Sequence, residues 1–206
     1  MRRSALAIKA GGAMNRHVRL LAVALALAAC QAQPTGPAPL EGARIGGPFK
    51  LIDQNGRPFT DADLRGRYAV VYFGYTFCPD VCPIGMGAIA AGLKQVEASD
   101  PALGAKVVPV FVTLDPARDT PAVLKTFVTA FHPRAIGLTG DAAAIAKVAR
   151  AYAVAHSKGE VSSGGGYLVN HTDAAYLMGP DGKPIATAEQ DRGPDAVAAV
   201  IRQWVK

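Results

Sequence analysis

Hydrophobic residues gather in blocks from residue 49 onward, and their spacing alternates between that of strands and that of helices. Residues 68–75 and 106–114 are continuous runs rich in β-branched and aromatic side chains, which is typical of central strands buried on both faces. Residues 135–138 form a shorter apolar run between two helical segments. These three runs predict the centre of a β-sheet.

Segments with helical spacing follow the strands. Pro83 stands where the first residue of a helix is expected, a position that proline favours. Further helices are predicted over residues 120–131, 141–152 and 193–205, where apolar residues recur at every third or fourth position. The helix near Pro83 carries its apolar face on Met86, Ile89, Ala90, Leu93 and Val96.

Turn-forming residues separate pairs of short strands. One hairpin is predicted over residues 49–60, with its turn at Asn55 and Gly56, and another over residues 174–188. Residues 157–166 are rich in serine and glycine, so they predict an exposed loop or hairpin tip.

The order of these elements predicts an α/β fold, because strands and helices alternate before a last antiparallel hairpin and a last helix. This order resembles a thioredoxin-like sandwich with a central mixed sheet and an N-terminal β-hairpin extension. We assign the folded domain to residues 49–206.

The first residues predict an export signal. Arg16 and Arg19 precede an apolar run of ten residues, 20–29, which is too short to cross a membrane. Small residues then lead into Cys30, a pattern similar to the lipobox of bacterial lipoproteins, in which the cysteine carries lipid. We therefore expect residues 1–29 to be a signal peptide and Cys30 to be the first mature residue.

Residues 30–48 are rich in proline, glycine and alanine, which predicts a flexible tether between the lipid and the domain. Together with the export signal, this segment predicts a domain that is anchored to a membrane through lipid on Cys30. The expected location is the bacterial periplasm.

The charge balance argues against nucleic acid as a partner. The chain has 22 basic and 16 acidic residues, but five basic residues and no acidic residue lie within the first 29. The remainder carries 17 basic and 16 acidic residues, and a nearly neutral domain gives no electrostatic reason to bind nucleic acid. Half of the chain is hydrophobic, which is enough for a sizeable core.

Cys78 and Cys82 lie where the first long strand ends and a helix begins, the place where parallel sheets put ligands. Two cysteines four positions apart in a helical turn are neighbours on one face, so they can form a disulfide or bind one metal ion. The helix N-terminus favours a thiolate there. Three residues separate the cysteines, whereas the common thiol oxidoreductase motif has two.

His171 is a third candidate ligand. It lies where the thioredoxin fold normally places a proline beside the active pair. Two thiolates and one imidazole suit Cu(I) in trigonal geometry and can hold Cu(II) with one more weak ligand. Structural zinc usually has a fourth protein ligand, and none is evident. The residues alone leave open a structural disulfide with an uninvolved turn histidine.

Four motifs closely resemble the SCO/SenC copper proteins, which assist assembly of the CuA centre of cytochrome c oxidase. Residues 74–83 read GYTFCPDVCP, and residues 114–121 read LDPARDTP. Residues 170–172 read NHT, and residues 176–182 read YLMGPDG. The resemblance extends from about residue 46 to the C-terminus.

The resemblance implies that Cys78, Cys82 and His171 bind one copper ion per chain, as Cu(I) or Cu(II). It implies a metallochaperone whose partner is the CuA-bearing subunit of cytochrome c oxidase, with an upstream copper donor as a further partner. The alternative is a thiol–disulfide reductase that uses Cys78 and Cys82 as a redox pair on the copper-ligand cysteines of that subunit. Enzymatic activity therefore stays open.

Two features depart from the family pattern. The family usually has aspartate where this chain has Asn170, and residues 84–87 are rich in glycine at a helix start. Glycine costs about 1 kcal/mol per helix position relative to alanine, so the second departure predicts a looser helix start.

Asp115 ends the second long strand and has two interpretations. It is predicted near the cysteine pair, where its carboxylate could tune the charge of the thiols or of copper. It could equally cap the next segment, and the sequence favours neither. Met86, one turn beyond Cys82, is interpreted as a core residue and not as a copper ligand.

Overall fold

The computed structural model describes residues 36–164 and 166–206. The signal peptide predicted over residues 1–29 and the lipidation predicted at Cys30 lie outside these ranges. Residues 37–206 form one structural unit. Within the described ranges, no helix has both the length and the hydrophobicity that a membrane span requires.

Within the described residues, a seven-stranded mixed sheet with the order β2-β1-β5-β4-β3-β8-β9 forms the centre of the fold. Strands β3 (Tyr68–Gly74) and β4 (Val107–Thr113) pair in parallel along their whole length, and every residue of β4 is buried. β5 (Ile136–Thr139) continues the parallel part, whereas β8 (Ala175–Met178) runs antiparallel to β3. The predicted central mixed sheet is therefore confirmed.

Hairpins form both edges of the sheet. β1 (Lys50–Asp53) and β2 (Pro58–Thr60) are the predicted N-terminal hairpin, and β1 also pairs antiparallel with β5. β9 (Pro184–Thr187) forms the other edge beside β8. Gly56 and Gly182 lie in the two turns with φ angles of 77° and 74°, a backbone region that favours glycine.

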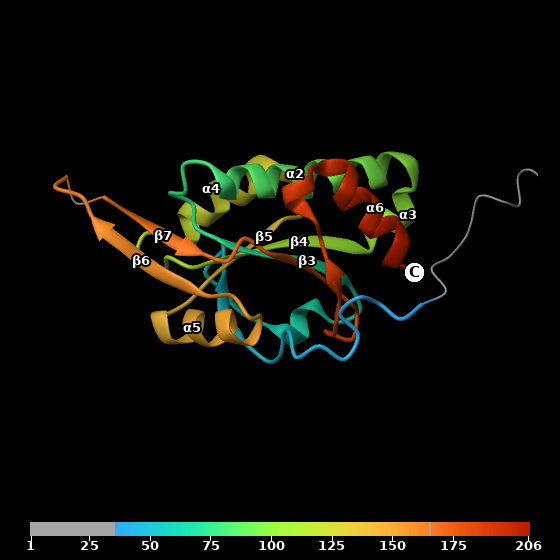
Figure 1. Cartoon of the computed structure of the whole chain (residues 1–206), viewed down its shortest axis with the longest axis horizontal. Coiled ribbons are helices and arrows are strands. Elements are labelled where there is room, and N and C mark those ends of the chain that lie inside the picture. The colour runs from blue at the N-terminus through green and yellow to red at the C-terminus, as the bar shows by residue number, and fades with distance from the viewer. Residues whose placement is uncertain (1–35, 165) are drawn as a thin grey trace, which may run out of the picture. The chain divides into compact units, whose positions relative to one another are not determined.

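Helices cover both faces of the sheet (Figure 1). The long helix α2 (Val81–Ser99) lies with α4 (Pro121–Phe131) and α6 (Pro194–Trp204) on one face. α5 (Ala142–Ala151) lies on the opposite face. Shorter helical segments among the described residues are α3 (Pro101–Ala105), η1 (Asp61–Leu64) and η2 (Gln190–Arg192).

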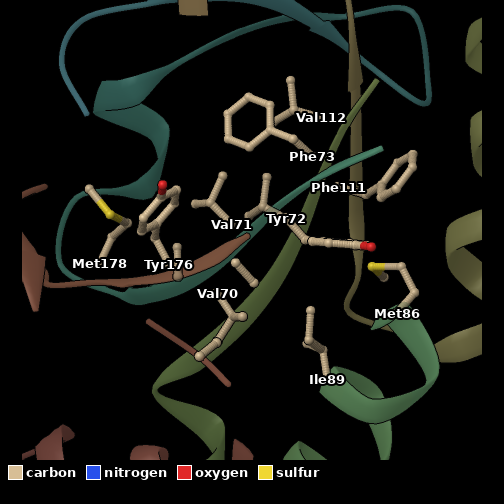
Figure 2. Packing of buried hydrophobic residues seen from close by; sticks show 14 of the residues in the cluster. Val70, Val71, Tyr72, Phe73, Met86, Ile89, Phe111, Val112, Tyr176 and Met178 are labelled. Carbon is tan, nitrogen blue, oxygen red and sulfur yellow. The ribbon is translucent and has the colours of Figure 1, made fainter. Parts of the chain in front are cut away.

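The side chains of β3 alternate between the two faces and fill the core on each side (Figure 2). Tyr72 points toward Met86 and Ile89 of α2, whereas Phe73 lies on the other face, 5.2 Å between ring centroids from Tyr152. Met86 is completely buried, which confirms its interpretation as a core residue. The core on the α2 side therefore lies directly beneath the first turns of this helix.

A second, two-stranded sheet extends beyond the central sheet (Figure 1). Its strands β6 (His156–Val161) and β7 (Tyr167–His171) pair antiparallel, and we call this sheet the arm. In the segment predicted as an exposed loop or hairpin tip, residues 157–166, residues 157–161 are thus part of strand β6, and residues 162–164 and 166 lie at the tip of the arm.

Part of the predicted tether is attached to the folded unit. The amide of Leu40 donates to the carbonyl of Ile185 at 2.9 Å, and the amide of Gly46 donates to the carbonyl of Ala151 at 2.8 Å. The chain from residue 40 to residue 46 is therefore fixed to β9 and to the last residue of α5.

Glu97 connects α2 to the segment between α4 and β5. Its carboxylate lies 3.3 Å from the ring of His132, which is buried, and accepts a hydrogen bond from Arg134. Arg134 also donates to the backbone oxygens of Gly104 and Val107. Burial would raise the pKa of Glu97, but the hydrogen bonds from Arg134 and His132 outweigh burial and lower it.

We expect Glu97→Gln to lower the free energy of unfolding by about 1 kcal/mol at pH 7, because Arg134 and His132 lose a charged acceptor. Since the folded-state pKa of Glu97 is lowered, its stabilisation is fully present above the pKa of the carboxyl group in the unfolded chain. It is lost as the pH falls through the folded pKa. Urea unfolding at pH 7 and pH 3 measures the effect.

Glu189→Gln is the matched control, because Glu189 pairs with an exposed Arg192 on the surface. This control should change the free energy of unfolding by less than about 0.5 kcal/mol. A difference between Glu97→Gln and the wild type that is as large at pH 3 as at pH 7 would contradict the prediction.

Candidate metal centre

The two cysteines lie between the end of β3 and the first turn of α2. The amide of Cys78 donates to the carbonyl of Tyr75 at 3.3 Å, which turns the chain after the strand. The amide of Cys82 donates to the sulfur of Cys78 at 3.4 Å. Both residues are free thiols, with Cys82 fully buried and Cys78 8% exposed. α2 begins at Val81, two residues before the predicted Pro83.

His171 reaches the cysteine pair from the end of the arm. Its Nε2 lies 3.4 Å from the sulfur of Cys82, although 89 positions separate the two residues. Its Nδ1 lies 3.0 Å from the carbonyl oxygen of Thr172. A carbonyl oxygen only accepts, so Nδ1 carries the hydrogen and the lone pair of Nε2 faces the sulfur. The ring of Tyr75 packs edge-on against the imidazole.

These positions fit the donor set that the sequence predicts for copper. Sulfur and nitrogen ligands at about 2.0–2.3 Å from one metal ion lie about 3.5–3.8 Å apart in tetrahedral or trigonal geometry. The observed 3.4 Å between Cys82 and His171 is close to this range. Two sulfurs and one imidazole form a soft donor set of the kind that copper prefers.

The three candidate ligands are near one another but do not yet form a complete metal site. In residues 36–164 and 166–206, no group of three or more His, Cys, Asp or Glu side chains is arranged as a finished metal site. Binding of one ion by Cys78, Cys82 and His171 therefore requires local movement, and Cys78 lies in the loop before α2.

Burial raises the pKa of the Cys82 thiol, and the neighbouring Cys78 adds to the rise. Cys82 is thus a neutral thiol at pH 7 in this form. Because a metal ion binds the thiolate, metal binding at Cys82 releases a proton.

Two glycines make room at this site. A Cβ atom on Gly74 would lie 2.9 Å from the sulfur of Cys82, and a Cβ atom on Gly85 would lie 2.8 Å from the hydroxyl of Tyr72. The Tyr72 hydroxyl donates to the carboxylate of Asp173 at 2.8 Å. Gly85 therefore lets α2 approach a tyrosine that holds the chain two residues beyond His171.

Asp115 is buried at the end of β4, and its carboxylate binds neighbours other than the thiols. It pairs with Arg118 and accepts a hydrogen bond from the hydroxyl of Tyr167 at 2.8 Å. The carboxylate thus connects the segment after β4 with the arm. A direct effect of Asp115 on the thiols or on copper stays a prediction.

Sequence reasoning missed Asp119, which fixes the cysteine loop to β4. Its buried carboxylate accepts hydrogen bonds from the amide and hydroxyl of Thr76 and from the hydroxyl of Thr113. Burial raises the pKa of Asp119, although these hydrogen bonds oppose the rise. Asp119 lies next to the start of α4, but the cap of that helix is Thr120, whose side chain accepts from the amide of Val123.

Comparison with known proteins gives the chain a family. The family model described as SCO1/SenC matches residues 37–206, which is most of the chain. The chain belongs to the SCO1/SenC family. The resemblance seen in the four sequence motifs is thereby confirmed.

Curated relatives match over the same region. Protein SCO2 homolog, mitochondrial, from Bos taurus is 44% identical over 144 residues, which are 69% of this chain and 53% of that protein. Protein SCO1 homolog 1, mitochondrial, from Arabidopsis thaliana is 39% identical over 168 residues, 80% of this chain and 49% of that protein. The SCO1/SenC chain spans about half the length of these relatives.

Solved structures of relatives confirm the thioredoxin-like fold. Arabidopsis thaliana ScoI with copper bound has a TM-score of 0.71 and 37% identity, covering 77% of this chain and 97% of that one. Bradyrhizobium japonicum ScoI with copper bound has a TM-score of 0.70 and 40% identity, covering 78% and 99%.

The predicted location is wrong by the same comparison. The first 48 residues predict the bacterial periplasm, whereas the curated relatives from Bos taurus, Arabidopsis thaliana and Saccharomyces cerevisiae are named mitochondrial proteins. The expectation depended on a lipobox-like pattern before Cys30. Such a short run of apolar and small residues is weak evidence for a compartment.

The glycines of α2 give a test of the packing at the site. Gly85→Ala should lower the free energy of unfolding by about 1–2 kcal/mol, because the new Cβ meets the buried Tyr72 hydroxyl. Gly87→Ala is the matched control in the same helix, since its Cβ would have no neighbour closer than 4.0 Å.

This control should raise the free energy of unfolding by about 0.5–1 kcal/mol through helix propensity. Thermal and urea unfolding of both variants give the comparison. Equal stabilisation by the two substitutions would show that Tyr72 and α2 are not in close contact.

Proposed function

We propose that this SCO1/SenC chain is a metallochaperone that binds one copper ion through Cys78, Cys82 and His171 and transfers it to the CuA-bearing subunit of cytochrome c oxidase. The contact of 3.4 Å between Cys82 and His171, beside the sulfur of Cys78, is the observation that carries the proposal. The copper in the structures of the Arabidopsis thaliana and Bradyrhizobium japonicum relatives supports it.

Each residue has a separate part in binding the cargo. Cys82 and Cys78 supply sulfur, and the hydrogen bond from Nδ1 of His171 to Thr172 keeps Nε2 free to bind. Binding displaces the proton of Cys82, so uptake releases protons to water. The tight packing around Cys82 excludes water, which protects Cu(I) and its thiolates from oxidation.

Transfer proceeds by exchange of ligands at the exposed side of the site. Cys78 is the more exposed of the two cysteine residues, so an incoming ligand from the acceptor replaces Cys78 first. The exposed side chains of Phe77, Val81 and Ile84 surround this side and give an acceptor protein an apolar surface to contact. An upstream copper donor would deliver copper by ligand exchange at the same exposed side of the site.

Attachment of the domain to a membrane stays a prediction, because Cys30 and residues 1–29 lie outside the described residues.

Copper titration of the reduced protein should show one ion per chain, with thiolate-to-copper charge transfer in the absorption spectrum. Cys78→Ala, Cys82→Ala and His171→Ala should each lose stoichiometric binding, because two remaining ligands hold copper poorly against competing chelators. His156→Ala is the matched control. His156 is paired with His171 across the two strands of the arm, but it is not one of the three proposed ligands. Unchanged binding in the three ligand variants would refute the proposed copper site.

A second candidate function is thiol–disulfide reduction by the same cysteines. It is favoured by the hydrogen bond from the Cys82 amide to the sulfur of Cys78, because this bond keeps the two cysteines together at the start of α2. The thiolate of Cys78 would attack a disulfide, and Cys82 would then release the product by forming a disulfide with Cys78.

His171→Ala separates the two functions. A reductase would keep its rate on a model disulfide in this variant, because only the two sulfurs exchange electrons. The chaperone would lose its copper. Parallel assays of copper binding and disulfide reduction on His171→Ala and Cys78→Ala therefore assign the function, and a loss of both activities in His171→Ala would contradict the reductase.

A further inference from the structure

The arm carries His171, yet the main-chain hydrogen bonds of the central sheet do not hold it. In the part of the chain that the structure describes, β6 and β7 pair with each other and with no strand of the central sheet. A two-stranded hairpin is at best marginally stable alone in water. The position of His171 therefore depends on side chains that connect the arm to the rest of the domain.

Alternation along β7 shows which side chains these are. Residues two positions apart in a strand point to the same side, so Tyr167, Val169 and His171 share one face. Val169 is buried, whereas Leu168 on the other face is 54% exposed. The face that carries His171 is therefore the face that packs on the domain.

Tyr167 makes two contacts with the segment after β4. Its hydroxyl donates to the carboxylate of Asp115 at 2.8 Å. Its ring lies under the guanidinium of Arg118, 3.7 Å from the ring centroid, and Lys158 of the paired strand also lies over it at 4.0 Å. A hydrogen bond to a carboxylate and a cation–π contact together fix both the position and the tilt of the ring.

Arg118 also reaches the cysteine loop. Its guanidinium lies 4.8 Å from the ring centroid of Phe77 and 5.8 Å from that of Tyr75, and it pairs with Asp115. One of its terminal nitrogens, Nη2, is buried without a hydrogen-bond partner among the described residues. Cation–π contacts with aromatic rings therefore account for much of the packing of this guanidinium. Because Phe77 directly precedes Cys78, Arg118 contacts both segments that carry the proposed ligands.

We propose that Asp115, Arg118 and Tyr167 form a clasp that positions His171 against the two sulfurs and so sets the affinity and geometry of copper binding. The clasp rests on the proposed function, since its purpose is the placement of a copper ligand. It acts on the N-terminal side of His171. The hydrogen bond between Tyr72 and Asp173 fixes the C-terminal side independently, so loss of the clasp loosens the arm without releasing it.

Tyr167→Phe tests the clasp, because it removes the hydrogen bond to Asp115 and keeps the ring beneath Arg118. Residues that orient metal ligands typically contribute 10- to 100-fold to affinity. We expect about tenfold weaker copper binding in Tyr167→Phe and about 100-fold weaker binding in Arg118→Leu, which also loses the contacts with the cysteine loop.

Two readouts separate positioning from general stability. In the Cu(II) form of Tyr167→Phe, nitrogen hyperfine coupling in the electron paramagnetic resonance spectrum should weaken while thiolate-to-copper charge transfer persists. In the metal-free protein, amide hydrogen exchange at residues 168–171 should be about tenfold faster, with exchange in β3 and β4 unchanged.

Tyr68→Phe is the matched control. It makes the same chemical change at the start of β3, where the hydroxyl accepts a hydrogen bond from the amide of Lys206. Copper affinity and exchange in the arm should both equal those of the wild type in this control.

The outcomes distinguish the clasp from the proposed function. Wild-type affinity and wild-type exchange in Tyr167→Phe would overturn the clasp. A wild-type protein that binds no copper would overturn the proposed function, and hydrogen exchange in the metal-free variants would still show whether Tyr167 holds the arm.

Discussion

The contact between the sulfur of Cys82 and Nε2 of His171 is the constraint on which the site depends. It joins the first turn of α2 to a strand that lies outside the central sheet. A contact between such distant segments persists only if both are held in place. Gly74 gives the sulfur its space beside β3, and the bond between Tyr72 and Asp173 fixes the chain after the histidine. The residues around the site therefore keep the sulfur of Cys82 and Nε2 of His171 close to each other.

The sequence predicts much of the central sheet and its helices because their signals are local. Strands β3 and β4 are buried on both faces, so they appear as continuous apolar runs. The turns at Gly56 and Gly182 need a backbone region that glycine favours, and they mark both hairpins. The candidate ligands were found because Cys78 and Cys82 lie in one short motif and because His171 replaces an expected proline.

Other parts of the site depend on contacts between segments that are distant in sequence. Asp119 precedes a helix and looks like part of its start, yet its carboxylate holds Thr76 across 43 positions. From the sequence alone, Gly85 only lowers the helix propensity of α2. The structure shows that a larger residue there would collide with the Tyr72 hydroxyl. Periodicity predicts which face of a strand is buried, but it contains no information about which distant carboxylate or ring meets that face.

The separation of the arm from the central sheet has a consequence for how this protein can change. Insertions, deletions or substitutions at the tip of the arm would leave the hydrogen-bond ladder of the core intact, because among the described residues that ladder does not include the arm. The inward face of β7 has no such freedom, since Tyr167 and His171 both lie on it. The outer end of this short hairpin can therefore vary, whereas its base must keep His171 in position. The outer end could acquire new recognition sequences at little cost to folding.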